Sequence, residues 1–242
     1  DAELSKDGMI NDGIIATKLG LQGIPVSAEL LILERDLTLL EYNNCRYHIS
    51  QISSASSVEI IRERKKKVNF SCGVSINNLS LNENDIGDFK TFLKLSPPLR
   101  TEEDRNALVQ GLVDETIDVI VSDHKPEDEE NKRLTFAQAE TGASGIETLL
   151  PLSLELYHNG SVNLETIIKA LTSSPAKILK INKGNLSIGN DADFCIVDIN
   201  KPWVVRKEKL ISKSKNTPIE DKKLQGKVMN TFVNGEELFK AE

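Results

Sequence analysis

Residues 117–124 read IDVIVSDH, a near-continuous apolar run that ends directly in an acid and a histidine. An apolar run of this length is typical of a strand that is buried on both faces, as the strands of a parallel sheet are. The carboxyl end of such a strand, where the chain enters a polar loop, is where barrel enzymes place their catalytic groups. This stretch therefore predicts an α/β fold and puts Asp123 and His124 at the edge of a candidate site.

Helix and strand patterns alternate on both sides of this stretch. Thr101 is suited to cap a helix that begins at the next residue. Strands are predicted at 46–53, 68–75 and 117–122, and helices at 26–42, 55–66, 102–114, 145–158, 162–171 and from Pro175. This alternation predicts βαβ units and a parallel sheet, with too few strands to close an eight-stranded barrel.

Glycine and asparagine punctuate the sequence after residue 183, as in GNLSIGNDADFCIVDI and GKVMNTFVNGEEL. Short strand patterns between such turn signals predict a small β-rich segment, here expected as a sandwich. We therefore expect two domains, a partial (β/α) barrel over residues 1–183 and the β-rich segment over 184–242. Two polar stretches, 77–100 and 124–144, are predicted to be long loops, and loops of this length are usually functional in compact domains.

The composition is that of an acidic globular protein of 242 residues, with 28% charged residues and a net charge of −7. An acidic chain argues against nucleic acid or an anionic membrane as a partner, and the one basic cluster, Arg62–Lys67, is expected on a solvated helix face. The three cysteines are far apart and form no CxxC pair, which favours a reducing cytoplasm. No membrane-length apolar run or signal peptide is visible. Because the chain opens on Asp1 without a methionine, we expect it to be cut from a longer protein.

Few residues at the predicted strand ends suit metal or nucleophilic chemistry. Asp123 is open to three interpretations, a metal ligand, a general base or a turn cap, while His124 beside it favours a structural role. The first strand ends near Gln51, and an amide is a poor ligand for transition metals. His48 faces away from Gln51 by the parity of the strand. The sequence holds no HxH pair, no GxSxG elbow and no phosphate-binding glycine motif, so a two-metal site cannot be assembled from these residues alone.

Longer motifs resemble one enzyme family. GIPVSAELLILERDLTLLEY, YHISQIS and KLSPPLRTEEDRNALVQGLVDETIDVIVSDHKPED are followed by GASGIETLLPLSLELYHNG, LTSSPAKILKINKGNLSIGNDADFCIVDINKPWVV and SKSKNTPIEDKKLQGKVMNTFVNG. In this order they resemble the second half of a dihydroorotase, a cyclic amidohydrolase, over essentially the whole chain. The resemblance implies the C-terminal portion of a TIM-type (β/α)8 amidohydrolase barrel with a one- or two-zinc centre. It also implies the interconversion of N-carbamoyl-L-aspartate and dihydroorotate in pyrimidine biosynthesis.

The resemblance assigns site residues as well. Asp123 matches the aspartate after the last barrel strand, which binds metal and takes and returns a proton. Gln51 stands where the family has a zinc-binding histidine. The implied substrate contacts are Ser96, where the family has asparagine, Glu127, where it has histidine, and Thr141 and Gly142. An acid at Glu127 is expected to repel a substrate carboxylate. The HxH pair, a bridging acid and another metal histidine would lie upstream of this chain.

Three functions stay open for the intact protein. One is dihydroorotase activity, and another is a non-catalytic pseudoenzyme that stabilises an aspartate transcarbamoylase assembly. A further cyclic amidohydrolase, such as a hydantoinase or allantoinase, is the third interpretation. The chain alone is expected to be inactive and to bind no stoichiometric zinc. A half-barrel leaves sheet edges open, so we expect the missing N-terminal half or a second copy in a homo-oligomer as its partner.

Overall fold

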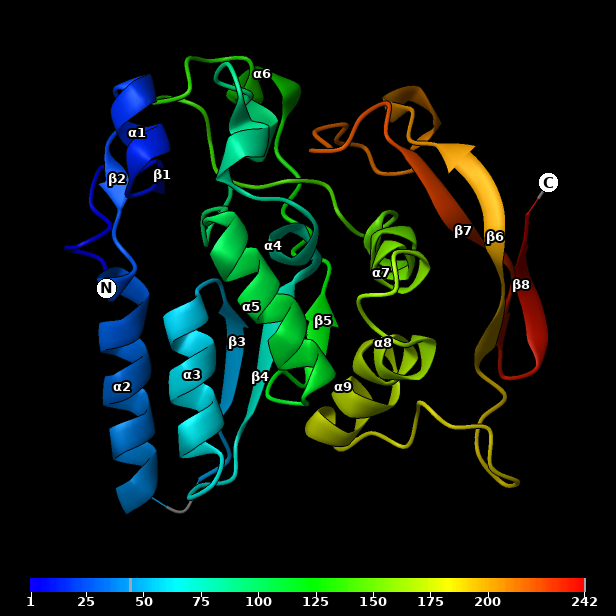
Figure 1. Cartoon of the computed structure of the whole chain (residues 1–242). Coiled ribbons are helices and arrows are strands. Elements are labelled where there is room, and N and C mark those ends of the chain that lie inside the picture. Colours follow the sequence, from blue (N-terminus) through cyan, green and yellow to red (C-terminus); the bar gives the residue numbers. More distant parts are fainter. Residues whose placement is uncertain (44, 242) are drawn as a thin grey trace.

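The computed structural model describes residues 1–43 and 45–241, and at its centre is a sheet of three parallel strands in the order β3–β4–β5 (Figure 1). Helices α2, α3 and α5 lie along this sheet, and helices α7, α8 and α9 lie between it and a second sheet, β6–β7–β8. The elements are β1 (Ile10–Asn11), α1 (Ile14–Leu19), β2 (Gly23–Ile24), α2 (Ser27–Tyr42), β3 (His48–Ile52), α3 (Ala55–Arg64), β4 (Ser71–Ser75), α4 (Ile76–Ser80), η1 (Glu83–Ile86), η2 (Thr91–Leu93), α5 (Glu102–Val113), β5 (Val119–Val121), α6 (Glu129–Lys132), α7 (Leu149–His158), α8 (Leu164–Leu171), α9 (Ser173–Leu179), β6 (Phe194–Val204), η3 (Lys207–Lys209), β7 (Lys223–Val233) and β8 (Glu236–Lys240).

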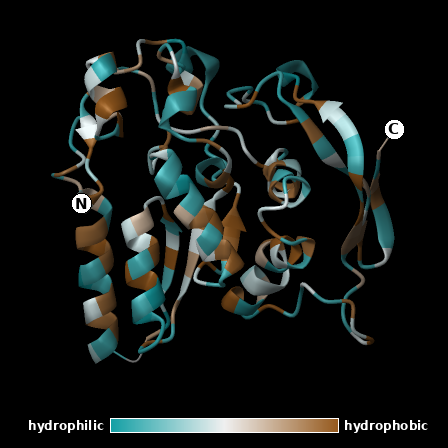
Figure 2. Cartoon of the chain, viewed as in Figure 1, coloured by the Kyte–Doolittle hydropathy of each residue, from teal (hydrophilic) through white to brown (hydrophobic). Residues whose placement is uncertain are grey.

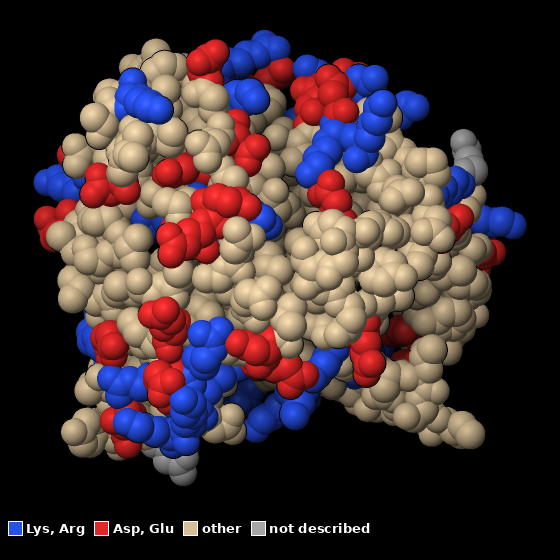
Figure 3. Space-filling model, in the orientation of Figure 1, with Lys and Arg blue, Asp and Glu red and all other residues tan. Residues whose placement is uncertain are grey.

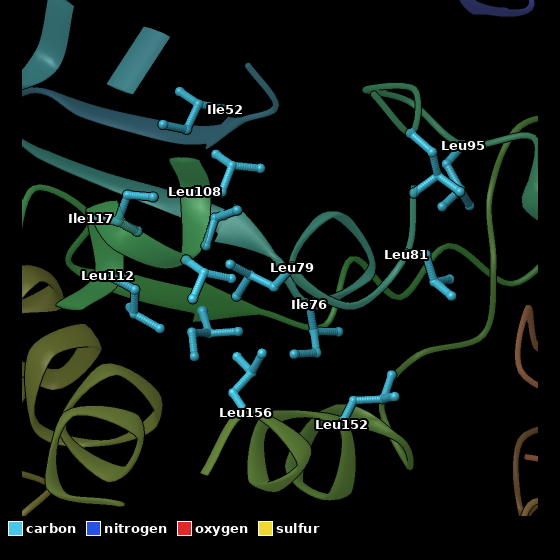
Figure 4. Close-up of a cluster of buried hydrophobic side chains, with 14 of the residues drawn as sticks. Ile52, Ile76, Leu79, Leu81, Leu95, Leu108, Leu112, Ile117, Leu152 and Leu156 are labelled. Carbon is cyan, nitrogen blue, oxygen red and sulfur yellow. The ribbon is translucent and has the colours of Figure 1, made fainter. Parts of the chain in front are cut away.

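The predicted parallel strands are present, each shorter than its sequence pattern. β4 pairs with both neighbours, and on the β5 side the register sets Gly73 opposite Val119. Apolar residues of the strands and of the helices between them form one core, in which Leu79, Leu108 and Ile117 are almost completely buried (Figure 4). In Figure 2, β5 is hydrophobic whereas α3 and α5 are hydrophobic only in part, the pattern expected of a buried strand beside amphipathic helices.

The predicted cap of helix α5 is confirmed. The Thr101 hydroxyl accepts a hydrogen bond from the Asp104 N–H at 3.1 Å, and the Asp104 carboxylate accepts one from the Thr101 N–H at 3.2 Å. This reciprocal capping box satisfies two backbone donors at the start of the helix. The helix predicted from residue 145 begins only at Leu149, because the Gly145 and Ile146 N–H groups donate to His124 Nδ1 in the loop that follows β5.

The stretch 77–100 is not one long loop, contrary to the prediction. The Ser75 hydroxyl accepts a hydrogen bond from the Asn77 N–H at 3.2 Å, and helix α4 starts directly after β4. Asn82 then caps the short helix η1, and η2 follows. Serine and asparagine are strong N-caps, so these local hydrogen bonds start two of the three short helices in this polar stretch, whereas η2 has no side-chain cap.

The strands expected after residue 184 form a single antiparallel sheet, β6–β7–β8. The segment that connects β6 and β7 packs against the first part of the chain. Its residues Val205, Leu210 and Ile219 are buried in the same core as the parallel strands. Helix α7 packs against β7. A sandwich form of this segment, and the domain boundary between residues 183 and 184, remain predictions.

The basic cluster Arg62–Lys67 lies at the end of α3 and is paired with acids. Arg62 contacts Asp114 at 2.7 Å, and Lys65 contacts Asp118 at the same distance. Figure 3 shows basic and acidic side chains intermixed over the face it presents. Among the helices of the described residues, none is both long and apolar enough to cross a bilayer.

Candidate functional site

Asp123 and Gln51, 72 residues apart in the sequence, meet at the carboxyl ends of β5 and β3. The Gln51 Nε2–H donates to Asp123 Oδ1 at 3.0 Å. Asp123 has a φ of 48°, in the left-handed region that aspartate tolerates better than most side chains. The fold therefore brings together the two residues for which the resemblance implied metal binding.

This pair does not by itself fit a zinc ion, which takes three or four protein nitrogen, sulfur or oxygen ligands in most sites. One Asp123 oxygen already accepts the Gln51 N–H. Within residues 1–43 and 45–241, no group of three or more His, Cys, Asp and Glu side chains is arranged to hold a metal ion. Additional ligands would have to come from outside the described residues.

Buried amide atoms near this sheet edge lack hydrogen-bond partners in the described part of the chain. Gln51 Oε1 and Asn77 Nδ2 are buried, and neither has a hydrogen-bond partner in the described part of the chain. Asn77 is 1% exposed and lies in the first turn of α4, directly after β4, the strand between β3 and β5. Buried polar groups are nearly always hydrogen-bonded, so we expect each of these two atoms to have a partner outside the described residues. The sequence pattern gave no reason to single out Asn77, because its signal is burial rather than residue type.

Arg100, from the PPLR motif, supports the end of β3. The guanidinium donates to Ser53 Oγ at 3.1 Å, to Asn11 Oδ1 at 2.8 Å and to the Ile24 carbonyl at 2.6 Å. Burial lowers the pKa of Arg100, and nearby acids, Glu29 first, oppose that shift. Glu29 also accepts the Ser53 N–H at 3.1 Å. The motif residues that carried the resemblance thus form a polar network that positions the strand bearing Gln51.

Ser96, one of the implied substrate contacts, lies beside this network. It lines a cavity of about 340 Å³ together with Gln51, Glu29 and Arg100. The Ser96 residue is exposed, whereas Arg100 is almost completely buried. The cavity therefore joins one implied substrate contact to one implied metal position.

The loop after β5 carries the remaining implied contacts. His124 Nδ1 accepts a hydrogen bond from the Gly145 N–H at 3.1 Å, so the imidazole closes the loop and has the structural role expected of it. The Gly142 N–H donates to the Lys94 carbonyl at 2.9 Å. The backbone N–H of Gly142, one of the implied substrate contacts, thus already has a protein partner.

Two lysines hold the outer part of this loop. Lys132 is 1% exposed and its Nζ donates to the Glu140 carbonyl at 2.6 Å. Lys94 donates to the Ala137 carbonyl at 2.9 Å. Burial lowers the pKa of Lys132 to about 8, and the attraction of Glu127 acts against that shift. Buried ammonium groups therefore tie together the loop segments that surround the implied contacts.

Asn216, from the KSKNTP motif, connects the two arms of the loop, one at Glu127 and the other at Gly142 and Ser144. Its Oδ1 accepts hydrogen bonds from the Glu127 N–H at 3.3 Å and from Ser144 Oγ at 2.9 Å. Its Nδ2 donates to the Gly142 carbonyl at 3.1 Å. Asn216 is 2% exposed, so a single buried amide sets the position of both arms.

We expect Asn216→Ala to destabilise the intact protein by about 1–3 kcal/mol and to increase proteolytic cleavage within residues 124–144, because buried groups lose their partner. Urea denaturation and limited proteolysis measure the two effects. Asn106→Ala, at an exposed position of α5, is the matched control and should change neither. Equal midpoints and equal cleavage for the two variants would show that Asn216 does not hold the loop.

The sequence pattern of the amidohydrolase family matches residues 15–238. The chain therefore belongs to the amidohydrolase family. Curated relatives within it are dihydroorotases: that of Ehrlichia chaffeensis is 42% identical over 100% of this chain and 55% of its own length. The dihydroorotase of Syntrophus aciditrophicus is also 42% identical, over 97% of this chain and 55% of its own length. The predicted resemblance is confirmed, and the chain spans about half the length of the curated relatives it matches.

Solved structures share the fold. The L-hydantoinase (dihydropyrimidinase) of Arthrobacter aurescens has a TM-score of 0.87 and 26% identity, over 98% of this chain and 53% of that one. The dihydropyrimidinase of Brevibacillus agri NCHU1002 has a TM-score of 0.84 over 90% of this chain and 50% of that one, and at 22% identity this likeness concerns the fold alone. The prediction of an α/β amidohydrolase fold is confirmed at this level.

Proposed function

We propose that the intact protein is a dihydroorotase, a cyclic amidohydrolase of pyrimidine biosynthesis, and that this chain is the C-terminal portion of its (β/α)8 barrel. The observation that carries the proposal is the position of Asp123. It lies two residues after the buried strand β5, and its Oδ1 accepts the Gln51 Nε2–H at 3.0 Å at the end of β3. Barrel enzymes use this edge of the sheet for catalysis, and the dihydroorotase relatives match the chain from end to end.

The missing part of the barrel is the first partner that we propose. The parallel sheet has three strands, and β3 and β5 are its outer members in the described residues. A closed barrel of this type needs eight strands. The upstream half would supply the others and would cover the edge of β3, and a homo-oligomer is proposed for the assembled protein. A cytoplasmic location is proposed from the cysteine pattern.

The proposed chemistry of this chain is proton transfer. In hydrolysis of dihydroorotate, a water oxygen adds to the ring amide carbonyl and the ring C–N bond breaks. The Asp123 carboxylate would take the proton that water loses and return it to the departing nitrogen. Since the described residues do not fit a metal centre, zinc in the intact protein would depend on ligands from the upstream half.

A non-catalytic role is the second candidate, and one observation favours it. The Gln51 amide donates to Asp123 in the place where the family has a metal-binding histidine. An amide N–H in that place stabilises the carboxylate without activating water. The protein would then act as a pseudoenzyme that stabilises an aspartate transcarbamoylase assembly.

The two candidates differ in turnover. The intact protein is assayed for loss of dihydroorotate with and without added zinc, and compared with the double variant Gln51→His, Glu127→His. Turnover of the unmodified protein at ordinary enzymatic rates, about 1 s⁻¹ or faster, supports the enzyme. A turnover rate that is orders of magnitude higher in the double variant than in the unmodified protein supports a degenerate site whose upstream metal ligands are intact. The pseudoenzyme is supported if neither protein turns over dihydroorotate and if an aspartate transcarbamoylase assembly that copurifies with the protein falls apart into smaller units once the protein is removed.

A further inference from the structure

Lys125 occupies a fixed place over Gly142 in the loop that follows β5. The Lys125 N–H donates to the Ala143 carbonyl at 2.9 Å, which anchors the lysine backbone. A Cβ atom built on Gly142 would come within 2.9 Å of Lys125 Cγ and Cδ, so the aliphatic stem lies against the glycine. Gly142 has a φ of 135°, which favours glycine and allows this approach. The direction of the Lys125 side chain is therefore set by packing.

The Lys125 ammonium lies between two of the implied substrate contacts. Its Nζ donates to Thr141 Oγ1 at 3.1 Å and is 3.6 Å from Glu127 Oε1. The Lys125 side chain is 55% exposed, whereas that of Glu127 is only 17% exposed. An ammonium has three N–H donors, so one remains for a ligand on the open side of the loop.

This geometry changes the electrostatic expectation for Glu127. Taken alone, an acid at this position would repel a ligand carboxylate. Paired with Lys125, it instead holds an ammonium in place, and the positive group is the more exposed of the two. Lys94 and Lys132 add positive charge near it, because both Lys94 and Lys125 act on the pKa of Lys132.

We propose that Lys125 binds the carboxylate of a carboxylated cyclic amide, the chemical class to which dihydroorotate belongs. Glu127 would be a positioning residue that holds the lysine and would not contact the ligand itself. The inference rests on the proposed function and deepens it. It assigns a substrate contact to a residue that neither the resemblance nor the sequence pattern singled out.

The test measures binding, so it does not depend on turnover. Isothermal titration of the intact protein compares dihydroorotate with 5,6-dihydrouracil, which has the same ring without the carboxylate. Lys125→Met should weaken dihydroorotate binding by about 10- to 100-fold, the effect of losing one charge-assisted hydrogen bond, and leave dihydrouracil binding unchanged. Lys125→Arg should restore most of the affinity. Lys66→Met, at an exposed lysine that forms an ion pair with Glu63, is the matched control and should bind both compounds as the unmodified protein does.

The results separate this inference from the proposed function. Unmodified protein that binds neither compound contradicts the proposed function and, with it, the role of Lys125. Unmodified protein that prefers dihydroorotate, with the same preference in Lys125→Met, contradicts the inference alone. Equal weakening of both compounds in Lys125→Met would show a structural role for the lysine and would also overturn it.

Discussion

Asp123→Asn in the intact protein is expected to lower kcat for dihydroorotate hydrolysis by about 10²- to 10⁴-fold, the usual contribution of a general acid–base group. Asparagine has nearly the shape of aspartate, and its Oδ1 can still accept the Gln51 N–H that Asp123 accepts at 3.0 Å. The local structure should therefore persist while the proton carrier is lost. Stopped-flow or steady-state loss of dihydroorotate gives kcat, and urea denaturation shows that stability is retained.

Asp128→Asn is the matched control for this experiment. Asp128 lies in the same loop and is exposed, and its side chain makes no capping hydrogen bond at the start of α6. We expect it to leave kcat within about twofold of the unmodified protein, since it has no role in the proposed chemistry. If Asp123→Asn and Asp128→Asn turn over at the same rate, Asp123 is not the proton carrier.

Arg100→Met should destabilise the intact protein by about 3–5 kcal/mol, because removing one member of a buried charged network leaves the others without a partner. Arg100 is 3% exposed and donates to Asn11, Ser53 and the Ile24 carbonyl. Asn11 in turn donates to Glu83 at 2.6 Å, so the loss of Arg100 also affects this buried acid. Methionine fills much of the volume of the arginine stem, so the change in stability reports mainly the loss of the guanidinium hydrogen bonds.

The urea midpoint and slope of Arg100→Met are compared with those of Arg133→Met. Arg133 is a matched control because its side chain is 71% exposed and its guanidinium pairs with Glu129 at the helical spacing of four residues. Exposed pairs of this kind contribute about 0–1 kcal/mol. Equal midpoints for the two variants would mean that the Arg100 network does not stabilise the fold.

Local patterns were sufficient for most elements of the first part of the chain. The apolar run 117–122 contains strand β5, and the helical stripe 26–42 is close to α2. Thr101 caps α5 as its position predicted. These features depend on residues a few positions apart, where periodicity and capping act, and such interactions can be seen in the sequence itself.

Local patterns predicted the secondary structure less well where serine and asparagine side chains hydrogen-bond to the nearby backbone. The polar stretch 77–100 indicated a loop, yet the side chains of Ser75, just before it, and Asn82, within it, start helices. The same residue types favour turns and N-caps, so composition alone does not separate the two.

The sequence by itself determined the α/β alternation, the place of Asp123 at the end of a buried strand and the resemblance to dihydroorotases. Only the tertiary structure decided which groups surround that aspartate. Gln51 reaches Asp123 across 72 residues, Arg100 reaches Asn11 across 89, and Asn216 reaches Gly142 across 74. The physical reason is range: periodicity and capping act within a few residues, whereas a site is made of hydrogen bonds and charges between segments that only the packed sheet and its loops bring together.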